Sequence, residues 1–172
     1  MAGKKKSSGK PRKDVFVLTL PLRVSDRDER DLLQAMETIR QIYNACLGGG
    51  KKRLRKLRAS PEWASARELP KTVLDQKSGK QVPNPARTEA YRAACQAYSF
   101  TQASLESYGI VCKNAAFAGR LGAPETQRMA QRAFGALEQH MFGKRGLPRF
   151  KGLRGVRSFE GKSDLASVRW RD

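Results

Sequence analysis

The residues of this chain whose types and spacing best suit chemistry form one basic segment, residues 143–157. It holds six Lys or Arg and no acidic residue, together with four Gly and one Pro. Gly and Pro disfavour regular structure, so we expect a loop that can follow an irregular polyanion. Phe150 lies between Arg149 and Lys151, which suits a phosphate backbone with a base or sugar stacked beside it. The alternative interpretation is a solvated linker, which charged runs commonly are.

The charge of the whole chain indicates the same kind of partner. Thirty-five Lys and Arg face 16 Asp and Glu in 172 residues, a formal net charge of +19. Such an excess opposes compact folding through self-repulsion unless a polyanion screens it. The cations cluster at residues 4–13, 51–58 and 144–157, as a nucleic-acid-binding surface requires. Nucleic acid is therefore the expected partner, with an anionic membrane surface as the alternative.

The predicted nucleic-acid-binding residues come from the second and third clusters. They are Lys51, Lys52, Arg53, Arg55, Lys56, Arg58, Lys144, Arg145, Arg149, Phe150, Lys151, Arg154 and Arg157.

Residues for catalysis or metal binding form no recognisable motif. The chain has no Gly-rich phosphate loop, Gly-x-Ser-x-Gly or His-Glu-x-x-His. His140 is the single histidine, and Cys46, Cys95 and Cys112 are too widely spaced for a structural zinc site. Each cysteine falls on an apolar helical face, where a small buried hydrophobe is expected. We therefore predict no catalytic residue, no metal and no cofactor in this chain.

Hydrophobic periodicity then indicates which elements position the basic residues. Alternation over residues 15–24 predicts a strand, and this apolar run is too short to span a membrane. Ser25 and Asp28 predict a capping box at the start of a helix, and the acids at 26–31 fit its N-terminus better than a metal site. We expect the glycines at 48–50 to end that helix.

The following elements are expected to be mostly helical. Predicted in order are a short basic helix at 51–58, a short helix from Pro61, a loop at 70–85, a helix at 86–98, a helix capped by Thr101, and a helix from Pro124 to Gly143. Strands at about 156–160 and 165–171 would complete a sheet of three strands. Because that sheet looks unfinished, we expect the chain to be the front part of a longer protein.

Several short motifs, each weak alone, occur in a characteristic order. After the opening strand come Ile42-Tyr43-Asn44-Ala45-Cys46, Ala133-Phe134 before a Gly-rich turn, Leu147-Pro148-Arg149-Phe150-Lys151, and Ser158-Phe159. From about residue 14 to the end, this order resembles the TnpB/OrfB proteins of insertion sequences. Those proteins are RNA-guided DNA endonucleases related to the type V CRISPR effectors.

The resemblance implies an α+β fold, in which an antiparallel β wedge, or partial barrel, is interrupted by a mostly α-helical insert. Residues 1–13 would be a disordered basic tail, 14–24 the first wedge strand, 25–143 the helical recognition-type insert, and 144–172 a truncated second part of the wedge. The implied partners are guide RNA and target DNA, in the cytoplasm or at the nucleoid of a prokaryote.

The family's catalytic and zinc-binding residues lie downstream of the region that this chain resembles. The resemblance therefore places Mg²⁺ and Zn²⁺ only beyond this chain, and we expect no catalysis by the chain alone. Two other hypotheses stay open. One is a stand-alone basic RNA-binding protein, for instance ribosome-associated, and the other is an enzyme whose site no motif identifies.

Overall fold

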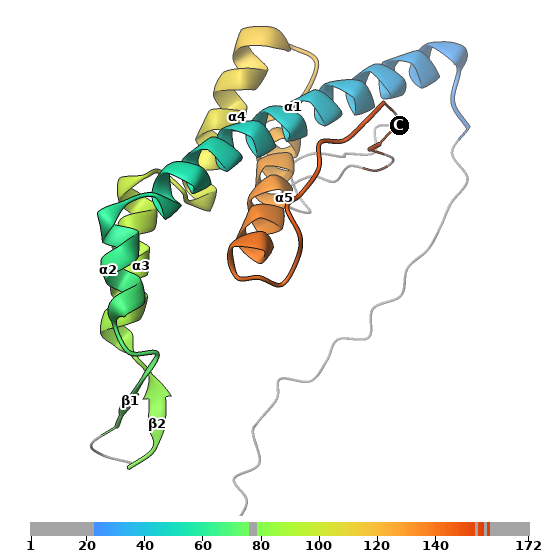
Figure 1. Ribbon diagram of the computed structural model, residues 1–172. Helices are drawn as coiled ribbons and strands as arrows, with labels where there is room; N and C mark the ends of the chain where they lie inside the picture. The colour runs from blue at the N-terminus through green and yellow to red at the C-terminus, as the bar shows by residue number, and fades with distance from the viewer. Residues whose placement is uncertain (1–22, 76–78, 154, 157, 159–172) are drawn as a thin grey trace, which may run out of the picture.

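The computed structural model describes residues 23–75, 79–153, 155, 156 and 158. This part of the chain is mostly helical and carries one small antiparallel sheet (Figure 1). The elements in order are α1 (Asp26–Arg58), α2 (Pro61–Glu68), β1 (Thr72–Leu74), β2 (Gln81–Pro83), α3 (Pro85–Ala97), α4 (Gln102–Ala116) and α5 (Ala123–Met141). The predicted strands at 15–24, 156–160 and 165–171 lie almost entirely outside the described residues.

Helix α1 begins with the predicted capping box. The Ser25 hydroxyl oxygen accepts the Asp28 N–H at 3.3 Å, and the Asp28 carboxylate accepts the Ser25 N–H at 3.1 Å. The Ser25 hydroxyl also donates to the Asp28 carboxylate at 2.7 Å, and this bond, followed by the one from the Ser25 N–H, lowers the pKa of the Asp28 carboxyl. The Asp28 carboxylate is thus explained by helix capping, and Asp26 and Glu29 lie in the same first turn, where the helix dipole favours acidic residues.

The predicted end of this helix at residues 48–50 is wrong, because α1 runs on to Arg58. A Cβ on Gly50 would lie 2.3 Å from Leu137 Cδ1, and one on Gly49 would lie 2.8 Å from Tyr108 Cε1. The glycines therefore let α4 and α5 approach the α1 backbone closely. This packing outweighs the cost of about 1 kcal/mol that each glycine imposes on a helix interior. The basic residues at 51–58 are consequently the last turns of α1 and not a separate helix.

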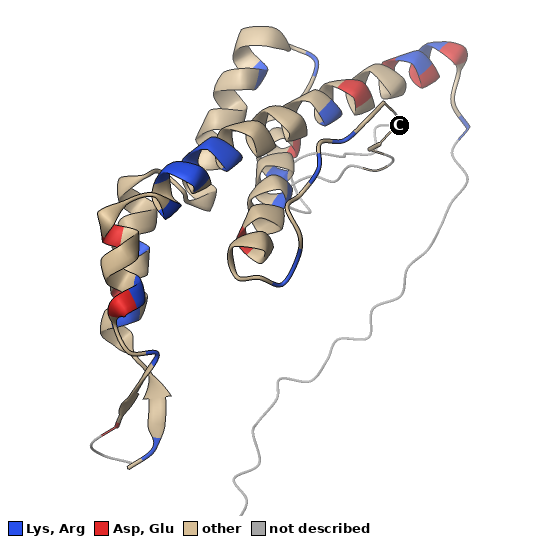
Figure 2. Ribbon diagram, viewed as in Figure 1, with Lys and Arg blue, Asp and Glu red and all other residues tan. Residues whose placement is uncertain are grey.

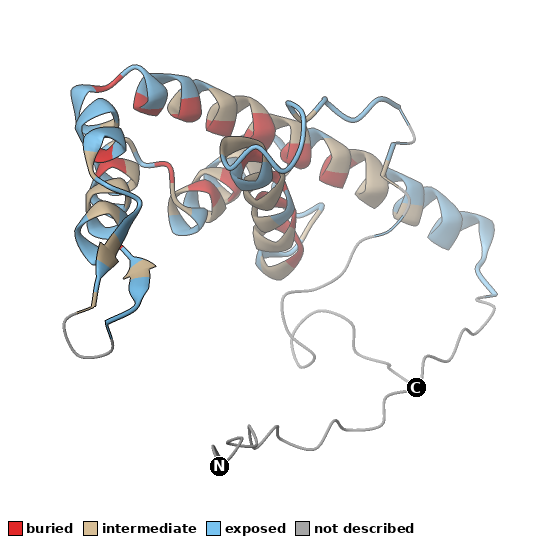
Figure 3. Cartoon of the chain, turned by 60° about the horizontal axis from the view of Figure 1, so that its bottom comes forward, coloured by how far each residue is buried: buried red, intermediate tan, exposed pale blue. Residues whose placement is uncertain are grey.

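The core lies where α1 crosses α4 and α5, and the buried faces of these helices turn toward one another (Figure 3). The fully buried side chains include Ile39, Ile42, Leu47, Leu105 and Leu137. The buried residues of α1 recur three or four positions apart, as in an amphipathic helix: Ile39, Ile42, Tyr43, Cys46, Leu47, Gly50, Leu54 and Leu57. The core thereby fixes which face of α1 remains available to solvent.

The prediction that the cysteines are buried holds fully for one of them. Cys46 is completely buried in the core, and burial raises the pKa of its thiol to about 12. Cys95 and Cys112 are half-buried, and all three thiols are free. Cys46 therefore acts as a small hydrophobe, as expected.

Residues 70–85 are not simply a loop, which corrects the prediction for this segment. Strands β1 and β2 pair in antiparallel register, with Val73 opposite Val82. At the base of the hairpin, the Asn84 side chain is buried, accepts the Ala86 N–H at 3.0 Å and donates to the Pro70 carbonyl at 2.9 Å. The strands have three residues each. Two such short strands give too weak an alternation to be recognised from sequence.

Candidate nucleic-acid interface

The basic loop at residues 143–153 leaves α5 through a well-defined C-terminal cap. Gly143 has φ +71°, its N–H donates to the His140 carbonyl at 3.1 Å, and the Lys144 N–H donates to the Gln139 carbonyl at 2.9 Å. These are the two hydrogen bonds of a Schellman motif, in which glycine supplies the left-handed conformation. The predicted end of the helix is confirmed, and the cap turns the loop back toward α1 (Figure 1).

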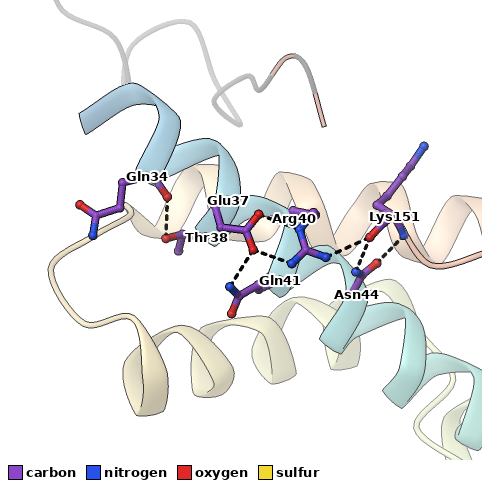
Figure 4. Close-up of polar contacts among 7 residues, drawn as sticks. All are labelled: Gln34, Glu37, Thr38, Arg40, Gln41, Asn44 and Lys151. Atoms are coloured by element: carbon purple, nitrogen blue, oxygen red, sulfur yellow. Dashed lines mark hydrogen bonds and ion pairs between the residues drawn. The ribbon is translucent and has the colours of Figure 1, made fainter. Parts of the chain in front are cut away.

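A polar clamp on α1 holds the middle of this loop (Figure 4). The Asn44 side chain accepts the Lys151 N–H at 2.8 Å and donates to the Lys151 carbonyl at 2.9 Å. Arg40 Nη1 donates to the same carbonyl at 3.0 Å. The backbone N–H and carbonyl of Lys151 are thereby both hydrogen-bonded to α1, although Lys151 and Asn44 are 107 residues apart in sequence. The loop is docked on the helix, and is not a free linker along this stretch.

The arginine of the clamp is itself positioned by Glu37. Arg40 donates to both carboxylate oxygens of Glu37, and Gln41 Nε2 donates to one of them at 2.8 Å. The hydrogen bonds from Arg40 and then Gln41 lower the pKa of Glu37 to about 2. The carboxylate, guanidinium and loop carbonyl form one continuous network, shown in Figure 4. Because the bidentate pair fixes the guanidinium plane, it aims the remaining N–H at the loop.

The aromatic residue of the loop packs on α1 while keeping much of its surface exposed. Lys51 Nζ lies 4.4 Å from the centroid of the Phe150 ring, a cation–π distance. A Cβ on Gly48 would lie 3.7 Å from Phe150 Cε1, so the ring lies beside the helix backbone. Phe150 is nevertheless 57% exposed. One part of the ring is therefore anchored, and the rest is available to a partner.

His140, near the end of α5, contacts both the C-terminal end of α1 and the start of the basic loop. Its Nδ1 lies 3.3 Å from the Arg145 carbonyl, and its Nε2 lies 3.5 Å from Arg58 Nη1. A carbonyl can only accept, so Nδ1 carries the proton and Nε2 accepts from Arg58. His140 thereby bridges α1 and the loop.

Two shallow grooves result from this docking. The α1 groove has a volume of about 550 Å³ and is lined by Lys51, Lys52, Leu54, Arg55, Arg58, Ala59, His140 and Leu147. The loop groove has a volume of about 960 Å³ and is lined by Tyr43, Lys51, Ala136, Arg145, Gly146, Leu147, Pro148, Arg149, Phe150 and Lys151. We call the two grooves together the basic surface. Among the described residues, no carboxylate lines either groove, and Lys51 lines both.

Most predicted binding residues lie on or beside the basic surface. Figure 2 shows Lys and Arg along the C-terminal half of α1 and on the loop after α5. Lys56 and Lys144 are exposed, although neither lines a groove. Arg154 and Arg157 lie outside the described residues.

Arg53 is positioned differently from the other predicted cations. Its Nη1 donates to the Ser99 carbonyl at 3.1 Å, and its guanidinium lies 5.4 Å from the centroid of the Tyr108 ring. It is half-buried and joins α1 to the turn between α3 and α4 and to the middle of α4. The structure therefore gives Arg53 a role in holding helices together.

Two positioning residues were missed by the sequence analysis, Asn44 and Arg40. Asn44 falls inside the Tyr-Asn motif, but nothing in a local pattern predicts a partner more than 100 residues away. One local signal exists, since an asparagine in the interior of a long helix is a poor helix former. An asparagine at this position therefore indicates that its side chain has a structural role.

Within the described ranges, no three His, Cys, Asp or Glu side chains come together as ligands for a metal ion. None of the helices in these ranges is both long and apolar enough to cross a bilayer. Comparisons with protein-family models, with curated proteins and with solved structures found no significant match to the chain.

Proposed function

We propose that this chain binds nucleic acid through the basic surface. We further propose that it is the wedge and recognition portion of a TnpB/OrfB-like RNA-guided DNA endonuclease, with guide RNA and target DNA as its partners. The main observation behind this proposal is that two basic segments about 90 residues apart in sequence line adjoining grooves. No carboxylate of the described residues lines either groove. A polyanion is the partner whose charge matches such a surface.

The spacing of the cations on α1 supports this proposal. Lys51, Arg55 and Arg58 follow one another at helical spacing, while Leu54 and Leu57 between them are buried in the core. Like charges four residues apart cost a helix about 0.2–0.5 kcal/mol per pair. The core thus holds in place a row of cations that repel one another, and phosphates bound along the row would relieve that repulsion.

The motif segments that carry the family resemblance also contact one another. Asn44 of the Tyr-Asn motif binds the backbone of Lys151 in the Pro-Arg-Phe-Lys motif, and Lys151 Nζ lies 6.0 Å from the Tyr43 ring centroid. In the proposed assembly, residues 14–24 and 144–172 contribute the wedge, and residues 25–143 form the helical insert. The nuclease centre, with its Mg²⁺ and Zn²⁺, would lie outside this chain. Sequence would be read by base pairing with the guide, and protein contacts would follow phosphates and A-form shape.

The direct test is the salt dependence of nucleic-acid binding. Arg55, Arg145 and Arg149 are exposed and line the two grooves. Replacing all three with Ala should flatten the slope of log affinity against log salt by about 2 to 3, since each lost phosphate contact removes about 0.7–0.9. Fluorescence anisotropy with a labelled structured RNA, over a series of salt concentrations, measures this slope.

A charge-matched control separates this surface from overall charge. Arg30, Lys80 and Arg120 are also exposed but line neither groove, and replacing them with Ala removes the same number of charges. This control should leave the slope within the error of the unmodified chain. Equal effects of the two triple variants would refute a defined binding surface and indicate unspecific attraction to a basic protein.

The identity of the bound RNA tests the more specific part of the proposal. RNA that copurifies with the chain, expressed from its own genetic locus, should be enriched in transcripts from the adjoining transposon end. Enrichment in ribosomal RNA instead would favour the stand-alone RNA-binding protein and exclude the guide-RNA partner.

A further inference from the structure

A second cleft, which shares only Arg58 with the α1 groove, lies between the α2–α3 pair and the facing ends of α4 and α5. Its volume is about 1070 Å³, close to the upper range of ligand-binding pockets. Helices α2 and α3 pack against each other and carry the β1–β2 hairpin at their far end, so they form a projecting arm (Figure 1). We call this site the arm cleft. No residue of the arm was predicted as a binding residue from the sequence.

One wall of the arm cleft is a pair of aromatic rings held in place by an arginine. The Trp63 and Tyr91 ring centroids are 4.6 Å apart, with the rings tilted by 57°. Arg87 Nη2 donates to the Tyr91 hydroxyl at 3.1 Å, and its guanidinium lies 5.4 Å from the Tyr91 ring centroid. Arg87 Nη1 also donates to the Leu69 carbonyl at the end of α2. The two half-buried rings are therefore fixed in orientation before any ligand binds.

The rest of the lining is strongly basic. Among the described residues, the lining holds five cations and one carboxylate, that of Glu138. The cations are Arg58, Arg67, Lys71, Arg87 and Arg92. Arg67 and Lys71 are exposed at the edge, where phosphate groups can reach them without desolvating the cation. Phe142, which is 62% exposed, adds an aromatic surface across from the arm. The cleft thus combines flat rings with a rim of positive charge.

We propose that the arm cleft binds an unpaired nucleotide of a nucleic-acid strand. Its base would stack on the Trp63–Tyr91 pair, and its flanking phosphates would contact Arg67 and Lys71. A base face is needed to use the rings, and a duplex keeps its base faces covered, so the ligand is single-stranded. An acidic peptide would pair with the cations but would have no flat base to stack on the rings. This inference rests on the proposed function for the class of partner, but it concerns a separate cleft that shares only Arg58 with the basic surface.

Trp63 provides a direct reporter, because the chain has only one other tryptophan, Trp170. In a Trp170→Phe variant, a short oligouridylate should quench the emission of Trp63 as its bases stack on the ring. The same strand paired with oligoadenylate should bind the protein without that quenching. Uridine monophosphate should bind far more weakly than the oligonucleotide, because it lacks the flanking phosphates. Oligoglutamate should leave the emission unchanged.

Substitutions in the cleft complete the test. Tyr91→Ala should weaken oligouridylate binding by about 5- to 150-fold, the effect of losing one stacked base. Tyr91→Phe keeps the ring and should bind nearly as well as the unmodified chain. Replacing Arg67 and Lys71 with Gln should flatten the salt slope for the single strand by about 0.7 per lost contact, without changing the slope for the duplex. This double variant changes only exposed side chains, so it remains informative if Tyr91→Ala unfolds.

The outcomes separate this inference from the function that it rests on. Suppose that the single strand and the duplex both bind, but that Trp63 emission does not change and the Arg67→Gln, Lys71→Gln double variant has no effect. This result would refute the arm cleft as a binding site and leave the proposal for the basic surface intact. Absence of all binding would overturn both. Quenching by uridine monophosphate at the affinity of the oligonucleotide would assign the cleft to a free nucleotide. Quenching by oligoglutamate would assign it to an acidic peptide, and either of these results would refute a strand-binding site.

Discussion

Alanine substitution at two neighbouring glycines of α1 should have opposite effects on stability. Replacing Gly with Ala in a helix interior contributes about 1 kcal/mol of helix propensity. At Gly48, the new Cβ would meet Phe150 at an ordinary 3.7 Å, so Gly48→Ala should gain most of this stability. At Gly50, the new Cβ would lie 2.3 Å from Leu137 Cδ1 and 3.1 Å from Leu105 Cδ2. Both leucines are completely buried, so neither has free space to move into.

The expected cost of that overlap can be compared with the gain. Overpacking a core by one carbon typically costs about 1–3 kcal/mol. Gly50→Ala should therefore be about 1–3 kcal/mol less stable than Gly48→Ala, because the gain in helix propensity is common to both and cancels. Urea unfolding followed by far-UV circular dichroism measures this difference, provided that the two variants show the same m-value. Equal stability of the two variants would refute the conclusion that close packing is why α1 continues through its glycines.

Removing the obstructing leucine supplies a second check on the same contact. Leu137→Ala alone should cost about 2–5 kcal/mol, because it opens a cavity in the core. In the double variant, the Cβ at residue 50 would enter part of that cavity. The two effects should then be less than additive, by about 0.5–3 kcal/mol. Strict additivity in the double-mutant cycle would show that the two positions do not interact.

Three further predictions concern the clamp and the cations. Asn44→Ala should speed hydrogen exchange of the loop amide that Asn44 holds by about 5- to 150-fold, since two hydrogen bonds of about 0.5–1.5 kcal/mol each are lost, while α1 amides stay protected. NMR titration should give Glu37 a pKa of about 2, which Arg40→Ala should move up toward 4.5. Because this pKa is lower in the folded state, the stabilisation is present above about pH 4.5 and is lost as the pH falls toward 2. Arg53→Ala should lower the urea midpoint with little change in the salt slope of RNA binding, whereas Arg55→Ala should do the reverse.

The ends of several helices were predictable from sequence because each depends on a few adjacent residues. Thr101 caps α4 by accepting the Ser104 N–H at 3.2 Å, and Gly143 ends α5, both as predicted. Ser25 and Asp28 form the expected capping box of α1. Capping is decided by hydrogen bonds within one turn, so a local pattern is sufficient to identify it.

The C-terminal part of α1 and the hairpin were beyond the reach of local patterns. Three consecutive glycines predict the end of a helix, and only the positions of Leu137 and Tyr108 on other helices explain why α1 continues. The hairpin of three-residue strands is likewise secured at its base by Asn84, which reaches Pro70 across 14 residues. In both cases tertiary contacts outweigh the local preference.

The features of the candidate site also divide into those that sequence predicts and those that only the tertiary structure decides. Sequence alone identified the cations of the basic surface and the exposed aromatic Phe150, because charge and residue type need no coordinates. Tertiary structure decided that Phe150 packs beside Lys51, that Asn44 holds Lys151, and that Arg53 joins helices. It also brought Trp63 and Tyr91, 28 residues apart, into one aromatic wall. Such contacts depend on how helices cross, and crossing depends on side-chain packing between elements distant in sequence, which no single segment records.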